Sequence, residues 1–305
     1  MMANRALIVA VLFGWLGGGL VRAAAPTHAE SCGPGALGVS RTIAVGGAPQ
    51  LGLKTYPQTL DLQDHKVVLT FDDGPAATTP AVLAALDAEC AKATFFLIGR
   101  NAAGLPALVR REVAAGHTVA HHSFSHPAVS LAGLPLEAAL ADIDRGVAAV
   151  DKAAGGKASK FFRFPGFGDS PALLEALAQR NMPTFGADLW ASDWNRMTPQ
   201  VELELVMERL RHAGRGILLL HDIHRQTADM LPALLTRLKA ENFHLVHLAP
   251  GDAPPPTRPA PPGWKSETAA YFAHSGNLRA ARTRHDLPIL TPVAAPSKAV
   301  AAPTP

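Results

Sequence analysis

The chain has 305 residues, of which 48% are hydrophobic, and a formal net charge of +3. This length supplies a core for one large domain or two small ones. Six basic and three acidic residues lie from Gly251 to Pro305, so this tail holds the whole excess of positive charge and residues 1–250 are about neutral. A neutral body without a basic stripe argues against nucleic acid as a partner.

The amino terminus has the three parts of a secretory signal peptide. Arg5 precedes the apolar stretch "ALIVAVLFGWL", and small residues follow in "VRAAA". The apolar run is shorter than a membrane-spanning helix requires, which favours cleavage after Ala23. The sequence therefore predicts a signal peptide over residues 1–23, export to a periplasm or to the exterior, and no stable membrane insertion after cleavage. The alternative is an N-terminally membrane-anchored protein.

Export gives the two cysteines, Cys32 and Cys90, a setting in which they can pair. A disulfide would tie an N-terminal arm, residues 24–64, to the domain that follows. The alternative is that Cys90 is a small buried residue and Cys32 has no fixed place. Spacing in the sequence does not decide between the two, because it gives no distance between the sulfur atoms.

From residue 65 to 250, short β-rich runs alternate with longer stretches of helical spacing. The β-rich runs are KVVLTF (66–71), ATFFLIG (93–99), HTVAHH (117–122), KFFRFP (160–165), TFGADLW (184–190), GILLLH (216–221) and HLVHL (244–248). Helices are expected over 80–90, 105–116, 134–153, 171–180, 199–213 and 226–241. The pairs Thr79-Pro80, Ser170-Pro171 and Thr198-Pro199 predict helix starts, each a hydroxyl cap followed by proline. The alternation predicts a parallel sheet covered by helices, open or closed into a barrel.

Residues capable of chemistry fall at or just after the ends of five of these strands. They are Asp72 and Asp73, His121 and His122, Arg163, Asp193, and His221. Because the carboxyl ends of the strands form the ligand face of α/β folds, we expect one site assembled from separate loops.

The segment "HHSFSH" places His122 and His126 with three residues between them, a spacing that alone is a weak metal signal. A carboxylate from another strand end strengthens it. Two imidazoles and one carboxylate leave a zinc-type ion with an open position for water. Of the adjacent acids Asp72 and Asp73, one can then ligate the ion and the other can act as a base.

Five segments in order, "TFDDGP", "HSFSH", "RFPGF", "DLWASDW" and "LLLHD", carry a family resemblance. From Val67 to Leu248 the chain resembles the polysaccharide deacetylases, carbohydrate esterase family 4, which have the NodB homology domain. The resemblance implies a distorted (β/α)7 barrel, formed by a single catalytic domain over residues 65–250. Residues 251–305 lie outside it, and their Pro/Ala-rich composition predicts a partly disordered tail.

The resemblance also assigns roles to residues. It implies that Asp73, His122 and His126 bind the metal. Asp72 matches the base that deprotonates the attacking water, and His221 matches the acid that protonates the leaving amine.

Further positions match residues that support these groups. Arg163 matches an arginine that orients the base, and Asp193 matches an aspartate that pairs with the acid histidine. Trp194 and Leu219 match walls of the acetyl pocket. Gly166 stands at a position where the family commonly has tyrosine, so the backbone N–H that helps to bind the oxyanion is kept while the ring is lost.

Two more positions depart from the family pattern. His121 stands where asparagine or threonine is common. It is expected either to support the metal ligands or to serve as a spare ligand. Trp190 stands where many members have another acid.

The resemblance implies a metal-dependent hydrolase that removes N-acetyl groups from N-acetylglucosamine-containing polysaccharide or oligosaccharide, of the chitooligosaccharide or peptidoglycan type. Zn²⁺ is the expected ion, and Co²⁺ or Ni²⁺ suits the same ligands. One alternative is an O-acetyl esterase acting on acetylated xylan or exopolysaccharide. Others are a non-catalytic polysaccharide-binding module and a structural metal site, which usually has four protein ligands.

Overall fold

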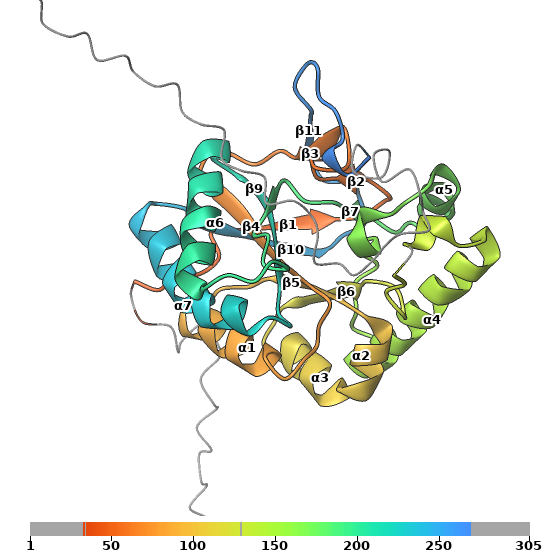
Figure 1. The fold of residues 1–305 in the computed structure, drawn as a ribbon, viewed down its shortest axis with the longest axis horizontal. Coiled ribbons are helices and arrows are strands. Elements are labelled where there is room, and N and C mark those ends of the chain that lie inside the picture. Colours follow the sequence, from red (N-terminus) through yellow and green to blue (C-terminus); the bar gives the residue numbers. More distant parts are fainter. Residues whose placement is uncertain (1–32, 34, 129, 270–305) are drawn as a thin grey trace, which may run out of the picture.

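The computed structural model describes residues 33, 35–128 and 130–269 (Figure 1). The predicted signal peptide, Cys32 and the end of the predicted tail lie outside these residues. Within the described part of the chain, no helix is both long enough and apolar enough to cross a membrane.

Parallel strands form the centre of the molecule. The strands are β1 (Arg41–Val45), β2 (Gln50–Leu51), β3 (Gln58–Leu60), β4 (Lys66–Asp72), β5 (Thr94–Leu97), β6 (Thr118–His121), β7 (Thr184–Phe185), β8 (Leu189–Trp190), β9 (Gly216–His221), β10 (His244–Pro250) and β11 (Thr257–Pro259). β4 lies between β5 and β9, β6 follows β5, and β8 follows β9. Bridges from His121 to Phe162 and from Phe162 to Thr184 continue the ring to β7. These segments make the predicted distorted (β/α)7 barrel.

The barrel departs from regularity at two predicted strands. Residues 160–165 contribute bridges at Phe162 alone, and residues 184–190 split into β7 and β8. Among the described strands, β7 and β8 do not pair with each other. The N-terminal arm fills the gap, because the Gly186 N–H donates to the Leu51 carbonyl and the Lys54 N–H donates to the Ala187 carbonyl.

Helices cover the outside of the strands in an arc from α6 and α7 to α4 and α5 (Figure 1). They are α1 (Thr79–Ala88), α2 (Gly99–Gly104), α3 (Pro106–Ala114), α4 (Leu136–Ala154), α5 (Pro171–Gln179), α6 (Pro199–Ala213) and α7 (Arg225–Ala240), with short 3₁₀ turns η2 (Leu131–Gly133) and η3 (Pro165–Phe167). Six of these were predicted and α2 was not. The Ser170 and Thr198 hydroxyls cap α5 and α6 as expected. The expected cap at Thr79 is wrong, because Thr78 is the N-cap and the Thr79 hydroxyl binds the Asp222 carboxylate.

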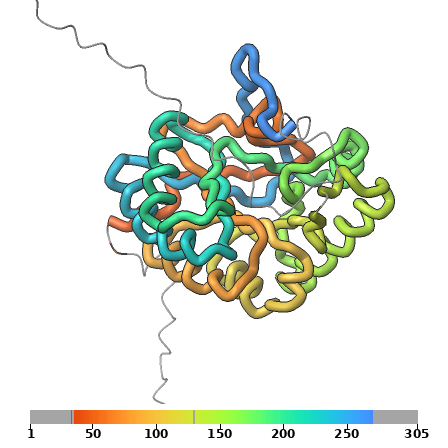
Figure 2. Tube along the Cα trace, viewed as in Figure 1, coloured from red at the N-terminus to blue at the C-terminus, as the bar shows by residue number. Residues whose placement is uncertain are grey.

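The two ends of the described chain meet beside the barrel, where Figure 2 follows them as the orange and blue parts of the trace. β1 pairs in parallel with β10, and β3 pairs antiparallel with β11. The Trp264 indole N–H donates to the Leu53 carbonyl at 2.7 Å. Residues 251–269, the first part of the predicted tail, therefore pack on the arm through contacts between residues far apart in the sequence.

Strand β4 shows how the fold delivers acids to one face. Val67, Leu69 and Phe71 belong to the core under the helices, and Val68 belongs to the separate core inside the barrel. Because side chains alternate along a strand, Thr70 and Asp72 share the inner face with Val68. The end of the strand thus places Asp72 in the barrel mouth.

Candidate active site

Asp73, His122 and His126 lie together above the barrel mouth. The Asp73 Oδ1 atom is 3.1 Å from His126 Nε2 and 3.5 Å from His122 Nε2. One donor atom from each of the three residues lies within 4.8 Å of the others, and both histidines are buried. The predicted ligand set is therefore brought to one point.

The turn after β4 positions Asp73. Its backbone has φ 72°, in the left-handed region that aspartate tolerates better than most residues. A cis peptide bond joins Gly74 to Pro75, and the Asn101 side-chain amide donates to the Asp73 carbonyl at 2.8 Å. The two adjacent acids contact different neighbours, Asp73 the histidines and Asp72 the guanidinium of Arg163.

The chemistry of the donor set suits a divalent ion. His122 Nδ1 lies 2.7 Å from the Arg163 carbonyl, which fixes the proton on Nδ1 and leaves the Nε2 lone pair toward Asp73. Burial holds the pKa of His122 well below its usual value, so this imidazole is neutral, as a ligand must be. Burial opposes ionisation of Asp73, but the nearby histidines outweigh it and hold its pKa below the usual range.

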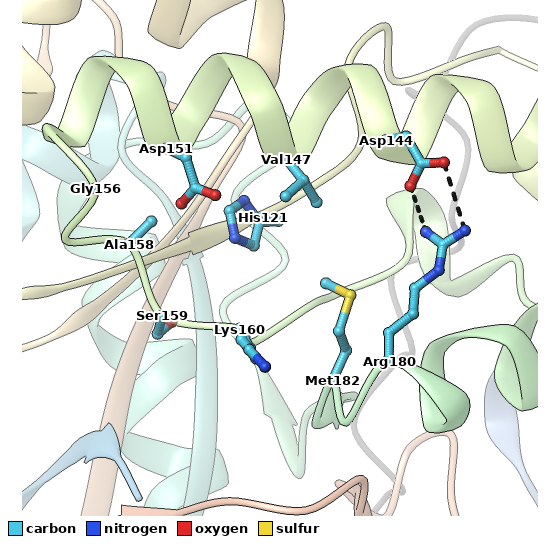
Figure 3. Close-up of a pocket in the computed structure, with 10 residues that line it drawn as sticks. All are labelled: His121, Asp144, Val147, Asp151, Gly156, Ala158, Ser159, Lys160, Arg180 and Met182. Carbon is cyan, nitrogen blue, oxygen red and sulfur yellow. Dashed lines mark hydrogen bonds and ion pairs between the residues drawn. The ribbon is translucent and has the colours of Figure 1, made fainter.

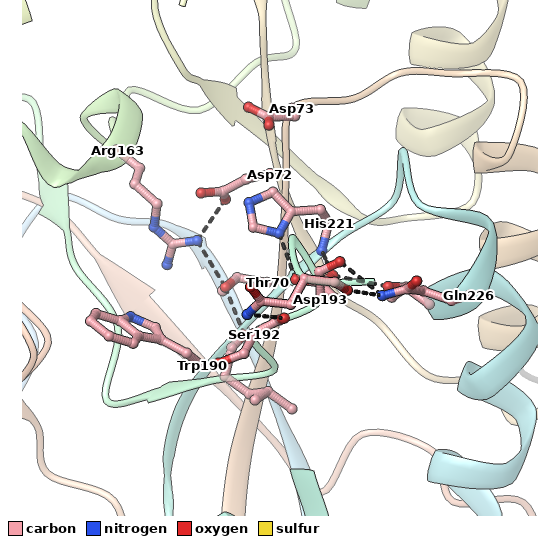
Figure 4. Close-up of polar contacts among 12 residues, drawn as sticks. Thr70, Asp72, Asp73, Arg163, Trp190, Ser192, Asp193, His221 and Gln226 are labelled. Atoms are coloured by element: carbon pink, nitrogen blue, oxygen red, sulfur yellow. Dashed lines mark hydrogen bonds and ion pairs between the residues drawn. The ribbon is translucent and has the colours of Figure 1, made fainter. Parts of the chain in front are cut away.

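The other acid, Asp72, pairs with Arg163 (Figure 4). Arg163 Nη1 donates to Asp72 Oδ1 at 2.6 Å and to the Thr70 hydroxyl at 2.9 Å. Nη2 donates to the Gly186 carbonyl at 2.8 Å, and the guanidinium lies over the Phe96 ring. Burial raises the pKa of Asp72, while the charge of Arg163 opposes that rise. The second Asp72 oxygen, Oδ2, lies 3.8 Å from His122 Nε2 and faces the cluster.

His221 and Asp193 form a second charged pair across the mouth. Asp72 and His221 are direct partners in the β4–β9 register. His221 Nδ1 lies 2.8 Å from Asp193 Oδ1, and the His221 backbone N–H donates to Oδ2 at 2.7 Å. Burial disfavours the imidazolium, but the Asp193 carboxylate outweighs it and raises the pKa of His221 to about 10. The imidazole is therefore protonated at neutral pH, with Asp193 as its acceptor.

Aromatic rings line one side of this pair. Trp194 meets His221 edge-on at 6.0 Å between ring centroids, and Trp190 meets Trp194 at 5.8 Å. Phe167 stacks on Trp190 at 6.2 Å. Buried Leu219 pairs with Trp190 in the β8–β9 register.

Gly166 lies in η3 with φ 56°, and a side chain there would meet open space. Gly166 carries no ring, but the next residue, Phe167, does. The Phe167 ring stacks on Trp190 and so joins the aromatic wall. The oxyanion role of the Gly166 N–H stays a prediction.

His121 lies away from the site, contrary to both roles considered from the sequence. As the last residue of β6 it faces outward, into a cavity of about 550 Å³ beneath α4 (Figure 3). Asp144 and Asp151 of α4 and Lys160 line the same cavity. Strand alternation explains the difference, since His121 and His122 point to opposite faces.

Cys90 is disulfide-bonded. Because Cys32 lies outside the described residues, the pairing of the two cysteines stays a prediction.

Several contacts at the site were not predicted. Thr70 binds Arg163, and the Thr227 hydroxyl donates to Asp193 Oδ2 at 2.9 Å. Gln226 donates to the carbonyls of Asp193 and Asn195 and so holds their loop. Thr70 gave a sequence signal, being a polar residue two positions before Asp72 in an apolar strand. Thr227 and Gln226 lie in the first turn of α7 and gave none.

Comparison with known proteins places these features in a family. The sequence profile of the family described as "Polysaccharide deacetylase" matches residues 60–185. A peptidoglycan-N-acetylglucosamine deacetylase of Bacillus cereus is 35% identical over 201 residues, which are 62% of this chain and 72% of that protein. A chitooligosaccharide deacetylase of Sinorhizobium fredii is 35% identical over 175 residues, 56% of this chain and 77% of that protein.

A solved structure gives the same result for the fold. A peptidoglycan deacetylase of Bdellovibrio bacteriovorus superposes with a TM-score of 0.59 and 29% identity, covering 74% of this chain and 66% of that one. These matches identify the chain as a polysaccharide deacetylase, an enzyme. The chain belongs to the polysaccharide deacetylase family.

Proposed function

We propose that the protein is an exported, metal-dependent hydrolase that removes N-acetyl groups from N-acetylglucosamine units of a polysaccharide or oligosaccharide. The observation that carries the proposal is the pairing of two charged dyads, Asp72 with Arg163 and Asp193 with His221, around one three-ligand cluster. A binding module needs neither a base nor an acid. A structural metal site needs no dyads either, and it usually has a fourth protein ligand.

Asp73, His122 and His126 would hold the ion, most suitably Zn²⁺. When bound, the ion supplies a Lewis acid that polarises the acetyl carbonyl and lowers the pKa of a water molecule. The neutral Nε2 of His122 and the ionised carboxylate of Asp73 are in the protonation states that binding requires.

Asp72 is the base of the proposed reaction. Arg163 holds Oδ1 at 2.6 Å, so Oδ2 is the oxygen that takes the proton from the attacking water. Burial makes Asp72 a stronger base than an exposed aspartate. The fixed hydrogen bonds of Arg163 to Thr70 and Gly186 keep the carboxylate oriented before substrate arrives.

His221 is the acid. Its Nδ1 proton is held by Asp193, so Nε2–H remains to protonate the amine that leaves when the amide bond breaks. The Gly166 backbone N–H is proposed as an oxyanion donor, and Trp194 and Leu219 as the walls that hold the acetyl methyl group.

The relatives support an N-acetylated glycan as substrate, since their names give peptidoglycan and chitooligosaccharides. Export rests on the predicted signal peptide over residues 1–23, and the signal peptide lies outside the described residues.

Acetate release tests the proposal. The protein would be assayed with chitin oligomers, peptidoglycan and acetylated xylan, with and without Zn²⁺, beside Asp72→Asn. We expect zinc-dependent release from an N-acetylated glycan and a loss of kcat of about 10²–10⁴-fold in Asp72→Asn, with zinc still bound. Release from xylan alone would favour the O-acetyl esterase, and zinc binding without release from any substrate would contradict hydrolysis.

A further inference from the structure

Glu202, in the first turn of α6, is a buried acid without a role in the proposed reaction. It is 0% exposed, and neither of its carboxyl oxygens has a hydrogen bond of ordinary geometry among the described residues. Burial of an ionised carboxylate without such bonds is costly, whereas a protonated carboxyl costs less and can itself donate. The neighbours of Glu202 therefore decide which form it takes.

The first turns of α6 and α7 meet beside the proposed acid pair. The Gln226 side-chain amide donates to the Asp193 carbonyl at 2.9 Å (Figure 4), and its oxygen accepts from the Met197 N–H, two residues before α6, at 3.5 Å. Glu202 of α6 and Thr227 of α7, both 0% exposed, lie next to each other at this junction. The junction therefore places a carboxyl against the hydroxyl that supports Asp193.

The Thr227 hydroxyl has a single hydrogen, and this hydrogen goes to Asp193. The hydroxyl donates to Asp193 Oδ2 at 2.9 Å, so it has none left for Glu202. Its oxygen can still accept a hydrogen bond, which only a protonated Glu202 can supply. Burial raises the pKa of Glu202 to about 8, and the charge of Asp193 adds to the rise. The carboxyl is therefore protonated at neutral pH, the form that this contact requires.

These contacts make a row of four side chains: Glu202, Thr227, Asp193 and His221. Asp193 Oδ1 lies 2.8 Å from His221 Nδ1, and Oδ2 takes the hydrogen of Thr227. The two oxygens of one carboxylate thus serve the imidazolium on one side and the hydroxyl on the other. A change in the second contact alters the charge that the carboxylate presents to the imidazolium.

We propose that Glu202 is a positioning residue for the proposed acid, His221. The inference rests on the proposed function. As a neutral acid, Glu202 donates to the Thr227 oxygen and so turns the hydroxyl hydrogen toward Asp193. As a carboxylate, it competes with Asp193 for the same hydrogen. The protonation of Glu202 therefore decides whether the Asp193 carboxylate accepts three hydrogen bonds or two.

Ionisation of Glu202 changes the strength of the acid. Among the described residues, the charged groups that act on Glu202 are Asp193, after β8, and His221, at the end of β9. With one hydrogen bond fewer and a second negative charge nearby, Asp193 holds the imidazolium proton more firmly. A proton held more firmly is transferred more slowly to the leaving amine. The reaction should thus slow as Glu202 loses its proton, before His221 loses its own.

Other titratable groups also act on the His221–Asp193 pair. They are Asp72 and Asp73 at the end of β4, and Asp222 and His224 in the loop after β9. The variants of Glu202 leave all four unchanged. A difference in pH dependence between Glu202→Gln and the wild type therefore reports on Glu202.

The first test is the pH dependence of kcat for an N-acetylated oligomer. In the wild type, kcat should fall about threefold to tenfold between about pH 7 and 9. Glu202→Gln cannot ionise, and its amide can donate to the Thr227 oxygen. Its kcat should therefore match the wild type at pH 7 and stay level to pH 9. Glu204→Gln makes the same change on the exposed face of α6 and is the matched control, which should keep the fall.

Glu202→Leu separates positioning from packing. Leucine fills the space but cannot donate to Thr227, so kcat at pH 7 should be about threefold lower than in Glu202→Gln, with KM unchanged. Equal kcat in these two variants would overturn the proposal. So would a fall of kcat with pH that is the same in Glu202→Gln and the wild type.

The NMR signal of the His221 Nδ1 proton tests the coupling without substrate. In the wild type this signal should shift around pH 8, the pKa of Glu202. Glu202→Gln should remove that part of the shift, and Glu204→Gln should keep it. If no acetate is released but this difference is seen, the proposed reaction is wrong and the positioning of the pair by Glu202 stands. If the signal shifts alike in Glu202→Gln and the wild type, the proposal is refuted whatever the activity.

Discussion

Replacing Asp193 by asparagine should move the alkaline limit of activity toward neutral pH. The Asp193 carboxylate accepts three hydrogen bonds, from His221 Nδ1, from the His221 backbone N–H and from the Thr227 hydroxyl. Its charge is also the main force that keeps His221 protonated against the effect of burial. An asparagine has one acceptor oxygen, so it cannot serve all three donors.

The size of the effect follows from the pKa of His221, which is about 10 against an ordinary 6.5. Without the Asp193 charge, burial lowers this pKa, while the charges of Asp73 and Asp72 still raise it. We expect a fall of about two to three pH units, equivalent to roughly 3–4 kcal/mol. The unsatisfied donor should lower the free energy of unfolding by a further ~1–3 kcal/mol.

The assay is kcat/KM for an N-acetylated oligomer between pH 6 and 11. Because His221 acts while protonated, activity is lost as pH rises through its pKa, near 10 in the wild type and near 7–8 in Asp193→Asn. Thr227→Val is the control, since it removes one hydrogen bond and keeps the charge. It should leave the alkaline limit in place and lower stability by about 1 kcal/mol. An alkaline limit that is the same in Asp193→Asn and the wild type would refute the reasoning.

Three further predictions concern the buried charges. Arg163→Lys keeps the charge but loses the two-pronged guanidinium contact with Asp72 and Gly186. The free energy of unfolding in urea should therefore fall by about 2–4 kcal/mol, and a fall below about 0.5 kcal/mol would contradict the role of this contact. Chelation should lower the melting temperature and abolish activity, and Zn²⁺ should restore both in the wild type but not in His126→Ala; restoration in that variant would exclude His126 as a ligand. Glu202 is buried and its pKa is raised to about 8, so the folded state keeps a proton that the unfolded state loses above about 4.5. The free energy of unfolding in urea should therefore fall between pH 5 and 8, and Glu202→Gln should reduce that fall by about 1–3 kcal/mol. The same pH dependence in Glu202→Gln and the wild type would contradict this role of Glu202.

Local patterns predicted the alternation of strands and helices and the polar residues at the strand ends, and the family resemblance predicted the closed barrel. The apolar run of β4 and the two acids that follow it are visible in the eight letters of residues 66–73. The 199–213 helix matches its prediction at both ends, since Thr198 and Pro199 mark its start and Gly214 follows its end. The domain boundaries and the residue roles stay predictions.

The parts that sequence reasoning missed depend on contacts between distant residues. The run 160–165 is rich in phenylalanine and was expected to be a strand, yet only Phe162 makes bridges. α2 lacks apolar periodicity and has glycine at both ends. The packing of Trp264 on Leu53 joins residues 211 positions apart, which composition alone does not encode.

The two ends of the described part of the chain meet beside Trp190, and they contribute to the surface next to the proposed site. The dyads and the ligand cluster come from strand ends inside the barrel. The neighbouring surface comes from Lys54, whose ammonium lies 5.1 Å above the Trp190 ring, and from Glu267, which pairs with that ammonium. Exchanging the arm and residues 251–269 for those of a relative would therefore reshape the approach to the proposed catalytic groups while leaving the strand-end residues in place. The barrel strands would then position the proposed site, and the flanking segments would shape the surface that a substrate meets first.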